Sequence, residues 1–194
     1  MKHHHYATRL DWTGNEGAGT STYRAYSRSH EISAPSKPAI PGSADPAFRG
    51  DPARWNPEEL LVASLSACHQ LWYLHLCAEA GIVVQAYSDE ASAVMVEQPD
   101  GAGQFESVTL RPRARLARGA DEQKARALHH EAAKMCFIAR SVSFRVDHEP
   151  SFETEAWAHP AAARRAGRTP SDVGGADILS SSPHLPLIRQ PCNA

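Results

Sequence analysis

Polar and apolar residues alternate at the start of the chain as they do in a half-buried strand. The side chains that share one face of this strand are Tyr6, Thr8, Leu10 and Trp12. The glycine-rich residues 14–19 suit a turn, because glycine adopts positive φ without steric cost. A weaker alternation over residues 20–32 predicts a second strand, so the pattern indicates an N-terminal β-hairpin.

Residues 33–55 have a different character. Five prolines lie between positions 35 and 52, which excludes a long helix or a central strand. Loops of this length in compact domains are usually functional or disordered. Because the segment also carries Phe48, Arg49 and Trp55, we expect an ordered loop that packs on the domain.

A helical period begins at Asn56 and runs to Gly81. Asn56 can cap a helix, Pro57 suits its first position, and Gly81 suits its end. One apolar face is predicted from spacings of three and four residues, and it consists of Leu61, Leu65, Cys68, Trp72 and Leu76. Further leucines widen the apolar surface, so we expect this helix to be covered on most sides.

Two more strands, a second helix and a last strand follow in the pattern. The strands are predicted over 82–96 and 105–116, with a turn between them. The helix is predicted over 120–139, with Asp121 as its cap, and the last strand over 142–148. The element order predicts an α+β domain in which two main helices cover an antiparallel sheet.

Beyond residue 157 the composition becomes rich in Ala, Pro, Gly and Ser, and no sustained periodicity remains. We therefore predict one domain over residues 1–157 and a disordered tail over residues 158–194 that contains Cys192.

Composition excludes several classes of protein. Hydrophobic residues make up 42% and charged residues 22% of the 194, which favours a globular domain. Twenty Lys and Arg against 22 Asp and Glu leave no basic excess for nucleic-acid binding. The longest apolar stretch, residues 60–84, is interrupted by polar side chains, so we expect no membrane span.

The N-terminus has no apolar signal core, which predicts a cytoplasmic protein. It carries three consecutive histidines at positions 3–5, which the sequence alone does not identify as native or as a tag remnant. They make a poor metal site, because nothing fixes the ligand geometry.

The four cysteines, at positions 68, 77, 136 and 192, form no CxxC pair. A zinc ribbon is therefore not indicated, and reduced thiols are expected in a chain without an export signal. Cys77 follows Cys68 by nine residues, which places the two on opposite faces of one helix and favours core packing for Cys77. Taken alone, Cys68 and Cys136 would each be read as small buried hydrophobes, because free cysteine is among the most buried residue types.

The residues around these two cysteines resemble a known family. The sequence NPEELLVASLSACH, followed 68 positions later by the second cysteine in AAKMCFIARSV, resembles the OsmC/Ohr family of thiol-dependent hydroperoxide reductases. The resemblance covers roughly residues 6–150 and is nearest to the OsmC-like branch. It implies an OsmC-like fold and an intertwined homodimer, with the long helices at its centre and two active sites at the subunit interface.

The resemblance also implies a reaction. Cys68 would attack an organic hydroperoxide and become a sulfenic acid, and Cys136 would resolve it as an intramolecular disulfide. A dithiol of the lipoyl type would reopen the disulfide. No metal, haem or flavin cofactor is implied.

A nucleophilic thiol at neutral pH needs a nearby cation or donor, because a free thiol has a pKa of about 8.5. In the family an arginine held by a glutamate supplies it, and Glu58 matches that glutamate. Arg49 is the preferred match for the arginine, with Arg24 and Arg28 as alternatives.

The spacing of Glu58 and Cys68 constrains the site. Ten residues of straight helix span about 15 Å, too far for Glu58 to hold a cation at its own chain's Cys68. Either the helix begins after Glu58 with a bend, or Glu58 serves the partner's site.

Two positions depart from the family pattern: His69 follows Cys68, and Phe137 replaces a common proline after Cys136. They leave the reacting atoms in place but bear on substrate preference, and His69 could act on the thiolate or face outward. An apolar pocket that favours bulky hydroperoxides could be lined by Trp72, Tyr73, Phe48 and Trp55. Core packing explains the same aromatics equally well.

Two other functions compete with peroxide reduction. One is a binding module that keeps an apolar interfacial pocket for a lipid or small ligand, without peroxidase turnover. The other is a metal site built from His69, His75 and the pair His129–His130. The metal site is the weaker, because adjacent residues of a helix project about 100° apart.

Overall fold

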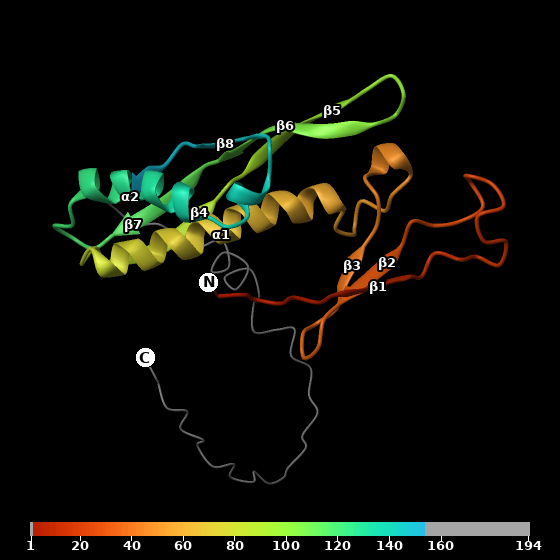
Figure 1. Cartoon of the computed structure of the whole chain (residues 1–194), viewed down its shortest axis with the longest axis horizontal. Coiled ribbons are helices and arrows are strands. Elements are labelled where there is room, and N and C mark those ends of the chain that lie inside the picture. The colour runs from red at the N-terminus through yellow and green to blue at the C-terminus, as the bar shows by residue number, and fades with distance from the viewer. Residues whose placement is uncertain (1, 154–194) are drawn as a thin grey trace, which may run out of the picture. The chain divides into compact units, whose positions relative to one another are not determined.

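The structure is a computed structural model that describes residues 2–153 (Figure 1). Met1 and residues 154–194 lie outside the described part, and with them the predicted tail and Cys192.

Three short strands near the N-terminus form an antiparallel sheet in the order β1-β2-β3. They are β1 (Arg9–Trp12), β2 (His30–Ser33) and β3 (Ile40–Gly42). The predicted hairpin is confirmed in its pairing, with Trp12 opposite His30. The second strand is shorter than residues 20–32, because the Arg28 guanidinium donates to the carbonyls of Tyr26 and Tyr23 at 2.6 and 2.7 Å and folds that segment on itself.

The proline-rich segment is ordered, as expected. It contains β3, which the sequence did not predict, and a turn of 3-10 helix at Pro46–Phe48. β3 lies at the edge of its sheet, a position that tolerates Pro41. Backbone hydrogen bonds from Ser43 to Trp55 (2.9 Å) and from Trp55 to Pro41 (3.2 Å) close the loop before the first helix.

Helix α1 (Pro57–Glu79) begins and ends at the signals predicted for it. Asn56 accepts from the Glu59 amide at 2.7 Å, and the Glu59 carboxylate accepts from the Asn56 amide at 3.2 Å. This reciprocal pair is a capping box. Gly81 follows the helix with a φ of 73°, a conformation that glycine adopts without strain.

The buried face of α1 differs from the predicted one. Its fully buried residues recur every four positions: Leu65, His69, Tyr73 and Cys77. Cys68 and Trp72 lie beside this stripe and are half-buried. Because α1 is apolar on most sides, the spacing of its largest side chains did not identify the face that packs inward.

The sequence predicted no membrane span, but helix α1 is long and apolar enough for one. It is 23 residues long, and an 18-residue window within it has a mean hydropathy of 1.2, so length and composition alone would allow a membrane span. Only 22% of that window is buried in the single chain. A helix at the centre of a globular protein passes the same test of length and composition, so this finding alone is weak evidence for a membrane span.

The rest of the described chain adds six strands and one helix. They are β4 (Val84–Asp89), β5 (Ser92–Glu97), β6 (Gly103–Leu110), β7 (Pro112–Leu116), α2 (Glu122–Met135), β8 (Arg145–His148) and β9 (Ser151–Glu153). They form two sheets in the orders β4-β7-β9 and β5-β6-β8. The predicted α+β class is confirmed, but each long strand predicted from the sequence is divided in two. The pairs β6–β8 and β7–β9 are parallel, so the sheets are not wholly antiparallel.

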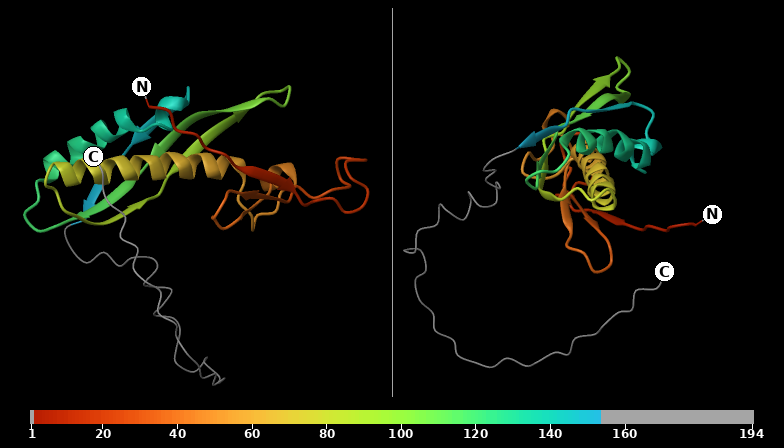
Figure 2. Two further views of the ribbon diagram at one scale, coloured as in Figure 1. Left: turned by 60° about the horizontal axis from the view of Figure 1, so that its bottom comes forward. Right: turned by 90° about the vertical axis from the view of Figure 1, so that its left-hand side faces the viewer.

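Helices α1 and α2 lie side by side, and α1 runs almost the full length of the strands (Figures 1 and 2). One core cluster joins both helices to β4 and β7, and its buried members include Tyr73, Cys77, Ala114 and Ala132. Burial of Cys77 confirms the core packing expected for it. A second cluster around Leu65 joins α1 to β6. The α1–α2 contact therefore runs along the second half of α1, with the start of α2 near the end of α1.

Removal of the cap tests how far α1 depends on it. Asn56→Ala is expected to lower the free energy of unfolding by about 1 kcal/mol, because the Glu59 amide loses its acceptor. Asn56→Asp retains an acceptor and should stay within a few tenths of a kcal/mol. Urea unfolding measures both, and equal losses for the two variants would contradict a capping role.

Candidate functional site

Cys68 and Cys136 meet where α1 and α2 pack together. Cys68 lies about three turns into α1 and is half-buried. Cys136 is the C-cap residue of α2 and is only 1% exposed. The Cys68 side chain is near enough to raise the pKa of Cys136, so residues 68 positions apart in the sequence lie next to each other.

The environment of Cys136 keeps its thiol protonated near neutral pH. Burial raises its pKa, and the neighbouring Cys68 side chain adds to this effect, bringing the pKa to about 11. The Ala139 amide, which donates to the Cys136 sulfur at 3.4 Å, acts in the opposite direction. Cys136 is therefore a protonated thiol near neutral pH.

This pairing suits two-step thiol chemistry. Cys68 is half-buried and so partly open to solvent, whereas Cys136 is almost completely covered by protein. Attack by Cys68 followed by closure onto Cys136 needs no large movement, because the two side chains already lie next to each other.

Glu58 lies in the first turn of the same continuous helix as Cys68. The alternative in which the helix begins after Glu58 is therefore wrong. Ten residues of helix separate the two by about 15 Å along the axis. Glu59, the neighbouring acid, is held in the capping box, so Glu58 is the acid of this pair that remains available to another group.

None of the three candidate arginines forms a hydrogen bond or ion pair with Cys68 or Glu58 among residues 2–153 of one chain. Arg28 is held in its own loop, with its guanidinium 4.3 and 4.2 Å from the ring centroids of Tyr23 and Tyr26. Arg24 and Arg49 are exposed. Arg49 has a φ of 65°, an uncommon conformation for a residue other than glycine.

The four aromatic residues proposed for a pocket lie on different parts of the fold, and two of them, Phe48 and Trp55, belong to the loop before α1. Tyr73 is fully buried and belongs to the core. Trp72, one turn beyond Cys68, meets Phe137 edge to face with 5.6 Å between ring centroids. Phe137 is 64% exposed, so this pair forms an apolar rim next to the two cysteines.

His69 is not at the surface, and no contact links its side chain to the Cys68 sulfur among the described residues. It is fully buried, and its Nε2 lies 3.0 Å from Nδ1 of His129. The ring of His148 lies 4.4 Å from the ring of His69, between centroids. Local spacing does not predict this grouping, because His148 is brought to His69 by the pairing of β8.

The histidines do not gather as the metal alternative requires. His75 is exposed and pairs with Glu79 at 3.4 Å. In the part of the chain that the structure describes, no group of three or more His, Cys, Asp or Glu side chains is placed to hold a metal ion.

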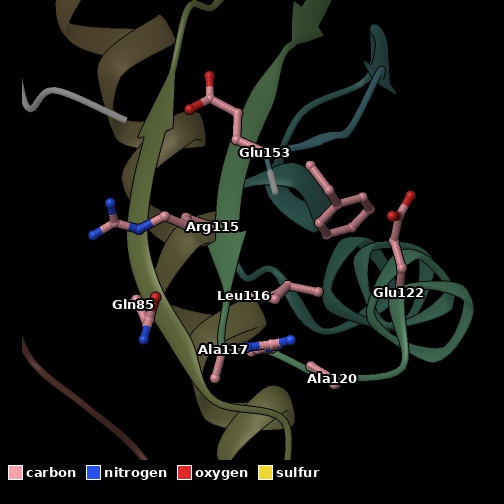
Figure 3. Close-up of a pocket in the computed structure, with 10 residues that line it drawn as sticks. Gln85, Arg115, Leu116, Ala117, Ala120, Glu122 and Glu153 are labelled. Carbon is pink, nitrogen blue, oxygen red and sulfur yellow. The ribbon is translucent and has the colours of Figure 1, made fainter. Parts of the chain in front are cut away.

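A cavity of about 720 Å³ lies near the start of α2 and includes neither Cys68 nor Cys136. Gln85, Arg115, Glu122 and Glu153 bring polar and charged groups to it from four different elements (Figure 3). It does not match the apolar pocket that the binding-module alternative needs.

The chain matches a known protein family over half of its length. A sequence model of the family described as OsmC-like protein matches residues 50–151, which include Glu58, Cys68 and Cys136. The chain belongs to the OsmC-like family.

Solved structures of OsmC-like proteins share the fold. An OsmC-like protein of unknown function from Vibrio cholerae is 28% identical, with a TM-score of 0.69, and the match covers 76% of this chain and 99% of the other. An organic hydroperoxide resistance protein from Legionella pneumophila is 18% identical, with a TM-score of 0.55 and coverage of 77% and 98%. An organic hydroperoxide resistance protein from Bacillus subtilis is 20% identical, with a TM-score of 0.51 and coverage of 76% and 98%.

No curated protein matches the chain significantly. The family and the fold are thus shown, and the fold is shared with proteins described by their role in hydroperoxide resistance.

Proposed function

We propose that the protein is a thiol peroxidase that reduces organic hydroperoxides to alcohols. The proximity of the half-buried Cys68 to the buried Cys136 is the observation that carries this proposal. Membership of the OsmC-like family supports it. The proposal includes a cytoplasmic location, where free thiols persist.

The reaction balances with the two cysteines and an external dithiol. The Cys68 thiolate attacks the distal peroxide oxygen, the O–O bond breaks, and the alkoxide leaves and takes a proton to become the alcohol. Cys136 then attacks the sulfur of the Cys68 sulfenic acid, and its proton leaves with the hydroxyl as water. A dithiol, which becomes a disulfide, returns both cysteines to thiols by exchange.

The rim beside Cys68 favours an apolar substrate. Trp72 and Phe137 present aromatic surface next to the reacting sulfur. A hydroperoxide with a bulky organic group can bury that group on the rim, whereas hydrogen peroxide cannot.

The active form is proposed to be a homodimer whose sites combine residues of both chains. The position of Glu58, about 15 Å along α1 from Cys68, supports this arrangement. The extensive exposed surface of α1, with Leu71 67% exposed, is consistent with it. In this arrangement Glu58 of one chain orients an arginine at Cys68 of the partner.

Arg49 is the preferred arginine for this role. It lies in the ordered loop before α1, where the Asp45 carboxylate accepts from the Ala47 amide at 2.7 Å. Its φ of 65° costs about 1 kcal/mol, and strained backbone of this kind is common at functional sites. Arg28, which is held between two tyrosine rings, is the least available of the three candidates.

Peroxide treatment of the reduced protein tests the function directly. One equivalent of cumene hydroperoxide, followed by alkylation and peptide mass spectrometry, is expected to yield a Cys68–Cys136 disulfide within seconds. Cys77→Ser is the matched control, because Cys77 is a buried cysteine of the same helix, and it should give the same disulfide. Free Cys68 and Cys136 after minutes of exposure would reject the peroxidase and favour the binding module.

A further inference from the structure

Three histidines from separate elements are packed together in the α1–α2 contact. His69 of α1 is 0% exposed and His129 of α2 is 2% exposed, and His148 of β8 lies against His69. The Tyr73 ring lies parallel to that of His129, with 3.7 Å between centroids. We refer to His69, His129 and His148 as the histidine cluster.

The hydrogen bond within the cluster leaves two ring nitrogens without partners. Each neutral imidazole has one N–H donor and one bare acceptor nitrogen. The bond between Nε2 of His69 and Nδ1 of His129 uses one of each. Nδ1 of His69 and Nε2 of His129 have no hydrogen-bond partner among the described residues, so the pair fits only in its neutral form.

The charged groups around the cluster do not compensate an added proton on His69 or His129. Arg126 disfavours positive charge on His129. Asp147 and Asp89 favour positive charge on His148, but both are engaged elsewhere. Asp147 forms an ion pair with Arg145, and Asp89 accepts from the Ser66 hydroxyl and the Arg111 amide. The charged and titratable groups that face the cluster are Arg126 and His130 of α2, Asp147 of β8, Asp89 and Tyr87 of β4, and Tyr73 of α1.

The histidine cluster and the two cysteines lie on the same two helices. His69 follows Cys68 directly in α1, and His129 lies two turns before Cys136 in α2. A cavity of about 340 Å³, lined in part by His129 and His148, reaches the cluster and gives protons a route to it.

We propose that the histidine cluster is an acid-sensitive latch that holds Cys68 against Cys136 at neutral pH and releases them when it takes up protons. Its effect on catalysis rests on the proposed peroxidase function, whereas the opening of the α1–α2 contact does not. Protonated imidazoles repel one another in the closed contact and are hydrated in the open one.

The direction of the pH response follows from burial. Burial and the neighbouring imidazoles lower the pKa of His69 and His129 to about 3 from the ordinary 6.5, and burial also lowers the pKa of His148. The open form therefore binds more protons than the closed form below pH 6.5. Between pH 7.5 and 5.5 the opening equilibrium is expected to rise about tenfold for each histidine released, or about 100-fold for His69 and His129 together.

Alkylation of Cys136 in the reduced protein, without peroxide, measures this opening. The labelling rate at each pH is divided by the rate in urea-unfolded protein at the same pH, which removes the intrinsic ionisation of the thiol. We expect the relative rate to rise about 100-fold between pH 7.5 and 5.5, while far-UV circular dichroism shows that the helices persist.

Single substitutions identify the titrating groups. His129→Gln should reduce the rise to about tenfold, and His69→Gln serves if that variant does not fold. His75→Gln is the matched control, because His75 is an exposed histidine of α1, and it should respond like the wild type.

A flat wild-type profile would overturn the latch without requiring any variant. A profile in His129→Gln and His69→Gln as steep as that of the wild type, or a response lost in His75→Gln, would also overturn it. Failure of the peroxidase itself would appear as the absence of a peroxide-induced disulfide, with the labelling profile unchanged, so the two proposals fail separately.

Discussion

Cys68→Ser is expected to lower kcat/KM for an organic hydroperoxide by about a thousandfold or more, because a serine hydroxyl is not ionised near neutrality. Cys136→Ser should behave differently. It retains the attacking sulfur and should consume about one equivalent of peroxide per chain, leaving Cys68 as a sulfenic acid that a dimedone-type reagent traps. Single-turnover peroxide consumption, followed by mass spectrometry, distinguishes the two variants.

Cys68 is assigned as the attacking cysteine because it is the more exposed of the two, and Cys136 as the resolving cysteine because it is buried and protonated. The same experiment can contradict this assignment. A sulfenic acid trapped on Cys136 in Cys68→Ser would mean that the buried thiol attacks first. Cys77→Ser, which removes a buried thiol that lies outside the pair, should retain wild-type turnover.

Glu58→Gln is expected to lower kcat/KM by about 10- to 100-fold, because the arginine at the partner's thiol loses the charge that orients it. The decisive measurement mixes Glu58→Gln with Cys68→Ser under conditions that exchange subunits. Half of the dimers are then mixed, and one of the two sites in each mixed dimer contains both Glu58 and Cys68. Activity should therefore recover to about a quarter of the wild-type value.

Recovery in the mixture requires Glu58 and Cys68 to act across the interface. A mixture no more active than its components would place both groups in one chain, against the geometry of α1. Glu59→Gln is the matched control: it alters the capping box and should cost up to about 1 kcal/mol of stability, with turnover within about twofold of wild type.

Local signals predicted both ends of α1 and the start of α2, but α2 ends at Met135, four residues before the predicted end. Asn56, Pro57 and Gly81 mark the ends of α1, and Asp121 caps α2, because each of these residues acts on backbone groups only a few positions away. Strand pairing was predicted less well. The breaks between β4 and β5 and between β6 and β7, and the parallel pairs made by β8 and β9, depend on contacts between distant segments.

The candidate site was also predicted in part only. The motif around Cys68 and the distant Cys136 were found through the family resemblance, and the structure brings the two together. The histidine cluster was not predicted, because α1 carries apolar residues on most sides and its periodicity therefore does not show that His69 faces inward.

Cys136 anchors the chain at two points, through its backbone amide and through its sulfur. It ends α2, where its amide donates to Ala132 at 2.9 Å, and its sulfur accepts from the Ala139 amide in the short turn that follows. In the proposed cycle, bond formation to Cys68 would redirect that sulfur and loosen its hold on the turn. The rim residue Phe137 lies between these two anchors, so each cycle would relax and restore the binding surface and would link product release to the oxidation state of the protein.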